Sequence, residues 1–163
     1  MTEPTQLTHV DAAGAAHMVD VSAKPVSGRT AVAAGRLRTT PEVIDLLRRD
    51  GLPKGDALAV GRIAGIMGAK RTPDLIPLCH PIALHKVTVD LQLTPDTVEI
   101  TATARTADRT GVEMEALTAV AVAGLTLVDM VKAVDPAASV DAVRVLSKSG
   151  GKTGEWHRPA DRQ

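Results

Sequence analysis

The sequence predicts an α+β fold, a ferredoxin-like βαββαβ sandwich with one additional helix. Two alternating segments, KVTVDLQL and TVEITATART, flank the turn Thr94-Pro95-Asp96 and are typical of a β-hairpin. A long helical pattern from Gly111 to Val134 follows, and the segment SVDAVRVL then returns to a strand pattern. Because one strand and two helices precede the hairpin, the order becomes strand, helix pair, strand, strand, helix, strand.

The first strand and the first helix meet at a clear boundary. Residues 29–38, RTAVAAGRLR, are rich in Ala and Val and predict a short strand. Thr40 followed by Pro41 is typical of a helix N-cap with proline at the first helical position, and Gly51 supplies the stop. We therefore expect a helix over residues 41–50.

The second helix has a face of small residues. It begins near Gly55-Asp56 and continues through LAVGRIAGIMGAK, where glycines and alanines recur at spacings of three and four. Small residues permit close backbone approach, and we favour packing against the protein's own sheet over a contact between subunits. Residues 72–84 contain three prolines, so we expect a braced loop there.

The length of 163 residues fits one domain. Residues 1–16 are small and polar without periodicity, which predicts a flexible N-terminal arm. A single domain is expected over residues 17–158, followed by a disordered tail at 159–163.

The composition argues against several classes of protein. The chain balances 19 basic with 19 acidic residues and has one aromatic residue, Trp156, whereas single-stranded nucleic acid is commonly held by aromatic stacking over a basic groove. The single cysteine, Cys79, permits no intrachain disulfide, and no secretion signal or membrane span is evident. The five histidines do not have the sequence spacing of metal ligands. We expect a cytoplasmic protein with no nucleic acid, no membrane, no metal and no cofactor.

The long helix carries the first candidate site. From Ala116 to Val128 it has no charge, which predicts burial on nearly every side. Asp129 and Lys132 then share one face, and Glu115, two heptads earlier, points within about 40° of the same direction. A partly desolvated acid and amine suit general acid/base catalysis. The alternative is an ordinary surface salt bridge at the helix end.

A second candidate site lies in LIPLCHPI, where Pro77 and Pro81 fix His80. A histidine on a rigid loop can present a ring nitrogen to a phosphate or accept a proton near neutral pH. The alternative is a structural histidine with its hydrogen bonds satisfied. Cys79 is adjacent, but nothing in the sequence indicates the lowered pKa that a thiolate nucleophile requires.

The C-terminal segment KSGGKTGEWHR places Lys148 and Lys152 around a glycine pair, an arrangement that suits a polyphosphate. It is not a P-loop, because Leu146 stands where the first glycine of that motif is required. The alternative is a flexible solvated tail. Lys54 adds a cation close to the start of the second helix, where an anion is favoured.

Four segments together resemble the cyclic pyranopterin monophosphate synthase family, also described as the molybdenum cofactor biosynthesis protein C family. They are MVDVSAK, RIAGIMGAKRTPDLIPLCHPI, TGVEMEALTAVAVAGLTLVDMVKAVD and KSGGKTGEWHR, and the likeness extends from Leu7 to Arg158. Small departures are Gly68, where alanine is common, and Ile82, where leucine is. The resemblance implies a catalytic domain that converts 3′,8-cyclo-7,8-dihydroguanosine 5′-triphosphate to cyclic pyranopterin monophosphate with release of diphosphate.

The resemblance also implies roles for individual residues. Catalytic roles fall on Asp129, Lys132 and Lys54. Substrate contacts fall on Leu78, Cys79, His80, Met114, Glu115, Lys148 and Arg29. It further implies a homo-oligomer, a hexamer built as a trimer of dimers, with sites at subunit boundaries. The competing hypothesis is a non-enzymatic ferredoxin-like module that binds RNA or a small ligand.

Overall fold

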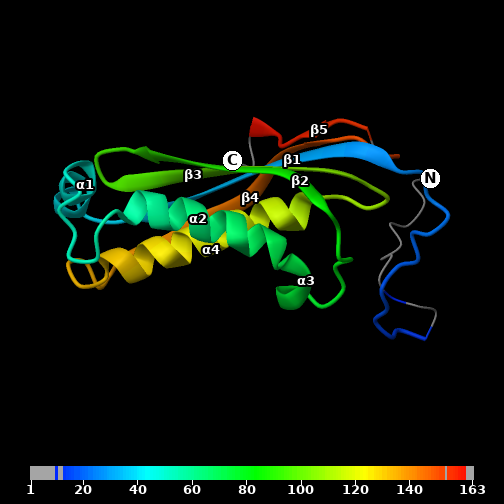
Figure 1. Ribbon diagram of the computed structural model, residues 1–163, viewed down its shortest axis with the longest axis horizontal. Helices are drawn as coiled ribbons and strands as arrows, with labels where there is room; N and C mark the ends of the chain where they lie inside the picture. The colour runs from blue at the N-terminus through cyan, green and yellow to red at the C-terminus, as the bar shows by residue number, and fades with distance from the viewer. Residues whose placement is uncertain (1–9, 11–12, 153, 161–163) are drawn as a thin grey trace.

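The computed structural model describes residue 10, residues 13–152 and residues 154–160, and these residues form one sheet covered by helices (Figure 1). The sheet order is β2-β3-β1-β4-β5, and every neighbouring pair is antiparallel. The strands are β1 (Ser27–Arg38), β2 (Leu84–Leu93), β3 (Thr97–Asp108), β4 (Ser139–Ser149) and β5 (Trp156–His157). The first four follow the predicted ferredoxin-like order, so the predicted fold class is confirmed.

The helices are α1 (Pro41–Arg48), α2 (Ala57–Lys70), α3 (Thr72–Leu75) and α4 (Glu113–Val131). As predicted, Thr40 caps α1: its side chain accepts a hydrogen bond from the Val43 backbone N–H. Asp56 caps α2 in the same way through the Ala59 backbone N–H. Both helices therefore begin where the capping residues place them.

Two short elements were not predicted. Helix α3 interrupts the expected loop at 72–84, because Pro73 lies in the first turn, where its missing N–H breaks no hydrogen bond. Strand β5 pairs Trp156 with Lys148 and extends the sheet beyond β4. The division into arm, domain and tail stays a prediction, because the arm lies largely, and the tail partly, outside the described residues.

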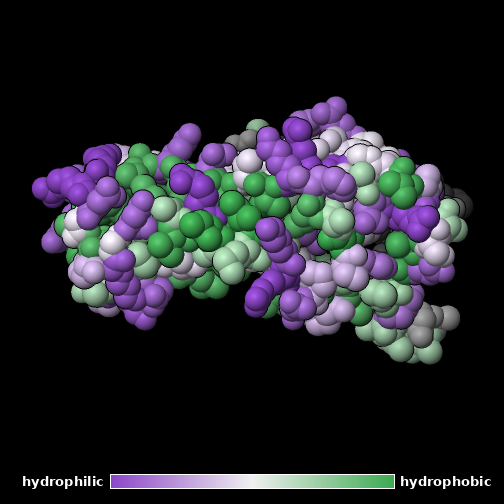
Figure 2. Space-filling model, in the orientation of Figure 1, coloured by the Kyte–Doolittle hydropathy of each residue, from purple (hydrophilic) through white to green (hydrophobic). Residues whose placement is uncertain are grey.

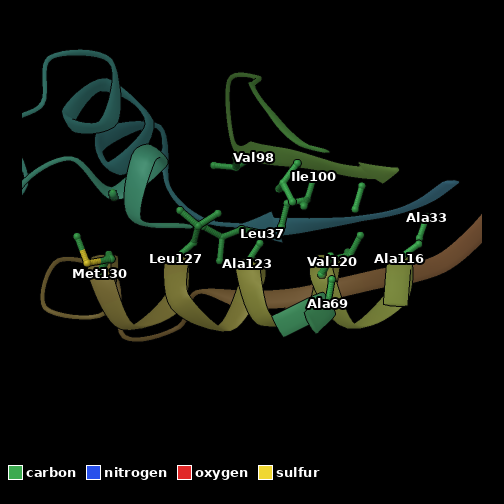
Figure 3. Packing of buried hydrophobic residues seen from close by; sticks show 14 of the residues in the cluster. Ala33, Leu37, Ala69, Val98, Ile100, Ala116, Val120, Ala123, Leu127 and Met130 are labelled. Carbon is green, nitrogen blue, oxygen red and sulfur yellow. The ribbon is translucent and has the colours of Figure 1, made fainter. Parts of the chain in front are cut away.

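The core lies between the sheet and α4 (Figure 3). Side chains of α4 point toward β1 and β3, and Ala123 and Leu127 have no solvent exposure. They meet Leu37 of β1 and Ile100 of β3, which are also fully buried. Because alanine and valine dominate this layer, the helix approaches the sheet closely without any aromatic side chain between them.

The glycine face of α2 packs mainly on α4, and β2 completes the contact. An ideal Cβ at Gly65 would stand 2.8 Å from the Ala119 carbonyl oxygen and 3.1 Å from Val89 of β2. One at Gly61 would stand 3.1 Å from Leu127. The predicted internal packing is thus correct, but its chief partner is a helix rather than the sheet.

The sequence predicted that helix α4 is buried on nearly every side. The structure differs, since Leu125 is 64% exposed in the single chain. By length and composition alone α4 could cross a membrane. Its inner face is nevertheless fully buried against the sheet, as in the core helix of a folded domain. Together these features describe a core helix with one apolar strip left uncovered.

Candidate functional site

A cavity of about 390 Å³ opens beside the first turn of α4. Three segments that are distant in the sequence line it: the stretch 19–24 that precedes β1, the loop that follows α3, and the residues that begin α4. Five predicted substrate-contacting residues meet here, namely Leu78, Cys79, His80, Met114 and Glu115. The sheet order explains the meeting, because the chain before β1, the chain before β2 and the start of α4 lie at the same end of the molecule (Figure 1).

Glu115 is the buried acid of this cavity. Its residue is 3% exposed, and burial raises the pKa of its carboxyl to about 7, with a smaller contribution from the nearby Glu113. A carboxyl that titrates near neutral pH can both donate and accept a proton, as a general acid/base requires. Burial, together with the Glu115 carboxylate, raises the pKa of the Cys79 thiol. The thiol form therefore prevails, which does not suit a nucleophile.

His80 is held on one side. Its Nε2 lies 2.8 Å from the backbone carbonyl oxygen of Val19. Because a carbonyl oxygen only accepts, Nε2 carries the proton in that hydrogen bond, and Nδ1 is left as the other ring nitrogen. The ring is thus oriented within the cavity by a main-chain group.

A small basic pocket adjoins the cavity and shares Glu113 with it. Lys148 Nζ lies 2.9 Å from Glu113 Oε1. Burial alone would raise the pKa of Glu113, but hydrogen bonds from Lys148 and from backbone N–H groups outweigh it and lower the pKa. Arg29 lines the same pocket and donates from Nε to the Asp108 carbonyl oxygen at 3.0 Å and from Nη2 to that of Arg109 at 3.1 Å.

The glycine pair singled out in the sequence makes room for Arg29. Gly150 and Gly151 have φ values of +94° and +69°, a left-handed conformation that favours glycine. An ideal Cβ on Gly151 would stand 2.2 Å from Arg29 Nη1. The Arg29 guanidinium therefore packs directly against the glycine backbone, where a larger residue would collide with it.

The three predicted catalytic residues form a separate cluster at the other end of α4. Asp129 Oδ2 accepts from Lys54 Nζ at 2.6 Å, and its Oδ1 pairs with Lys132 Nζ at 2.7 Å. Lys54 also donates to the Asp129 backbone carbonyl oxygen at 2.9 Å, so it caps the last turn of the helix. The hydrogen bond from Lys132, and then that from Lys54, lowers the pKa of Asp129 to about 2.

Glu115 and the cluster around Asp129 lie at opposite ends of α4 within one chain. The two residues are 14 positions apart on α4, which corresponds to about 21 Å along the axis. Glu115 is buried, whereas the acid and amine pair expected from the sequence, Asp129 with Lys132, forms at 2.7 Å with both side chains more than half exposed in the single chain. The shared direction around the helix stays a prediction, and separation along the axis places the groups at opposite ends.

Two charged residues of the cavity were missed by sequence reasoning. Glu113 precedes the uncharged stretch of α4, and Lys24 ends the quoted segment MVDVSAK, yet neither was assigned a role. The sequence feature that could have indicated Glu113 is that it is a second carboxylate two residues before Glu115. Among the described residues, no group of three or more His, Cys, Asp or Glu side chains could hold a metal ion.

Comparison with known proteins gives consistent matches. A model of the MoaC family matches residues 18–151. The chain is 67% identical over 153 residues to a cyclic pyranopterin monophosphate synthase of Streptomyces coelicolor, covering 94% of this chain and 90% of that protein. It is 62% identical over 159 residues to a protein of that name from a Nocardioides species, covering 96% and 98%. A Mycobacterium tuberculosis H37Rv relative, cyclic pyranopterin monophosphate synthase 2, is 62% identical over 153 residues, covering 94% and 92%.

Proposed function

The chain belongs to the MoaC family, and from that premise we propose that it is a cyclic pyranopterin monophosphate synthase, a lyase of molybdenum cofactor biosynthesis. Its substrate is 3′,8-cyclo-7,8-dihydroguanosine 5′-triphosphate, and its products are cyclic pyranopterin monophosphate and diphosphate. The observation that carries the proposal is that the family match, residues 18–151, contains every candidate site residue from Arg29 to Lys148.

The cavity beside α4 suits the rearrangement of the base. Opening and reclosing a ring requires protons to be added and withdrawn, and Glu115, with a pKa of about 7, can do both near neutral pH. His80 presents an oriented imidazole beside it. We assign the purine-derived part of the substrate to this cavity, with Leu78, Cys79 and Met114 as further walls, and the start of its phosphate chain to the rim of the cavity.

The cluster of Lys54, Asp129 and Lys132 suits the phosphate chemistry. Closing a cyclic phosphate and expelling diphosphate builds negative charge on the leaving group, which ammonium groups stabilise. With a pKa of about 2, Asp129 is ionised at neutral pH and orients both lysines. When phosphate oxygens compete for the lysines, Asp129 becomes a stronger base. Arg29 and Lys148 add positive charge beside the cavity.

We assign the complete site to two chains. One chain keeps the cavity and the cluster about 21 Å apart along α4, although both sets of residues are assigned to one substrate. On the outer side of the helices, large apolar side chains are left exposed: Val60, Ile63 and Met67 of α2, and Leu125 of α4. Figure 2 shows hydrophobic side chains gathered across the middle of the molecule, over α2.

A second copy of the chain fits this apolar face. A two-fold axis through its middle would exchange the two ends of α4, so the cluster of one copy would face the cavity of the other, and each pair would hold two sites. We propose a homo-oligomer on this basis, with three such dimers forming a hexamer. The protein acts in the cytoplasm, without nucleic acid and without a membrane.

Diphosphate release tests the function. Purified protein is incubated with the cyclised nucleotide, and diphosphate and cyclic pyranopterin monophosphate are quantified together. Wild type should form both in equal amounts, and Asp129→Asn should lose most turnover with an unchanged circular dichroism spectrum. Glu42→Gln, at an exposed position of α1, is the matched carboxylate control. Absence of product from wild type, with RNA retained in a filter-binding assay at physiological salt, would instead favour a binding module.

A further inference from the structure

One wall of the cavity is a stretch of chain without helix or strand. We call residues 19–24 the strap; Val19, Val21 and Lys24 line the cavity. Two side chains outside the strap hold its main chain. His80 binds the Val19 carbonyl oxygen near one end at 2.8 Å, and Arg109 donates from Nε to the Lys24 carbonyl oxygen at 3.0 Å at the other end. The strap therefore depends on hydrogen bonds to its backbone rather than on a regular element.

The strap also brings positive charge to a cavity that otherwise has acidic side chains. Among the described residues that line the cavity, Lys24 is the one lysine or arginine, and Glu113 and Glu115 line the same cavity. Glu113 is already paired with Lys148 at 2.9 Å. A polyphosphate that binds beside two carboxyl groups requires a cation that is not already paired with either of them. Lys24 is placed to supply it.

Arg109 belongs to a series of arginine contacts that reaches the strap from the basic pocket. Arg29, seated on Gly151, holds the Asp108 and Arg109 carbonyl oxygens. Arg109 in turn holds the Lys24 carbonyl oxygen. Each of these hydrogen bonds is accepted by a backbone carbonyl oxygen. The arginines therefore fix the strap relative to β1 and to the loop after β3, whatever side chain stands at position 24.

We propose that Arg109 is a positioning residue of the substrate cavity, which fixes the strap through the Lys24 carbonyl so that the Lys24 ammonium binds the phosphates of the substrate. This inference rests on the proposed function for the identity of the substrate. Lys24 touches the substrate, whereas Arg109 acts through Lys24. Removal of either residue should therefore weaken binding of the ground state and the transition state alike, raising KM more than it lowers kcat.

Two measurements test the proposal on the full-length protein. Hydrogen exchange followed by mass spectrometry reports the amides of the peptide that contains the strap, including the Lys24 N–H bound to the Val21 carbonyl. Steady-state kinetics with the cyclised nucleotide, and equilibrium dialysis with GTP as the probe, report affinity. Arg109→Gln should speed exchange in the strap and raise KM roughly tenfold or more, the loss of a charge-assisted contact.

The variants of Lys24 separate the two roles. Lys24→Gln should raise KM as Arg109→Gln does but leave exchange unchanged, and Lys24→Arg should restore affinity. The double variant should be no worse than the poorer single, because both act through one contact. Arg49→Gln, which removes a similar arginine contact to a backbone carbonyl on α1, should change neither readout.

Three outcomes would overturn the proposal: an unchanged KM in Lys24→Gln, an unchanged exchange rate in Arg109→Gln, or additive losses in the double variant. A wild-type protein that neither turns over the nucleotide nor binds GTP would instead reject the proposed function. In that case the exchange rates would still decide whether Arg109 holds the strap.

Discussion

Separation of the two half-sites along α4 predicts a specific pattern of complementation between inactive chains. Asp129→Asn inactivates the cluster end of a chain, and Lys148→Ala disrupts the basic pocket beside the cavity. In a mixed oligomer, some sites receive an intact cluster from one chain and an intact cavity end from its neighbour. Lys54→Ala mixed with Asp129→Asn should not complement, because these two side chains lie 2.6 Å apart at the same end of one chain.

The size of the recovery follows from counting. With equal amounts of the two variants and random assembly, the chance that a site receives an intact cluster is about one half, and so is the chance for an intact cavity end. The mixture of Asp129→Asn with Lys148→Ala should therefore regain about a quarter of wild-type turnover. The mixture with Lys54→Ala should remain at the background of the single variants.

The assay is diphosphate release after the two variants are unfolded together and refolded, with native mass spectrometry to confirm mixed oligomers. Each variant is first compared with wild type by thermal unfolding, so that loss of activity is not loss of fold. Mixed oligomers that stay inactive in both pairings would refute sites shared between chains. A monomeric mass in solution would refute the assembly itself.

Three further predictions concern single residues. Because the pKa of Glu115 is raised from 4.5 to about 7 in the folded state, its stability contribution is complete below pH 4.5 and is lost as the pH rises through 7. Wild type should therefore lose on the order of 3 kcal/mol relative to Glu115→Gln over that range in denaturant titrations, and a parallel pH dependence would contradict the assignment. Cys79→Ser should keep substantial turnover, since burial disfavours the thiolate; complete inactivation in a folded variant would reverse this view. Leu127→Ala should cost about 2–5 kcal/mol of unfolding free energy, measured by denaturant titration against the exposed Leu75→Ala as control. Equal losses in the two leucine variants would show that the core does not depend on Leu127.

The elements that follow from local pattern were predicted well. The hairpin, the long helix and the capped starts of the first two helices all depend on alternation, apolar runs or capping residues that neighbouring positions determine. The short strand β5 escaped prediction because two residues carry no period. Its pairing of Trp156 with Lys148 forms at the sheet edge, and the pattern of the neighbouring residues does not indicate it.

The candidate site was predicted in part, and its limits have a physical cause. Resemblance named residues that meet in the cavity, such as Cys79 and His80, and helix geometry correctly grouped Asp129 with Lys132. Resemblance treats residues as one set, however, and does not record which chain supplies each of them. The role of Glu113 was missed because its pairing with Lys148 depends on where β4 lies relative to α4.

The presence of one indole in the chain, with no phenol and no benzyl side chain, has a spectroscopic consequence. Trp156 lies beside Lys148 in the sheet, and Lys148 pairs with Glu113 at the edge of the cavity. Intrinsic fluorescence of the unlabelled protein therefore comes from a single position next to the basic pocket. A change in emission on mixing with a nucleotide would report events at this edge in real time, with residue resolution and without any introduced dye.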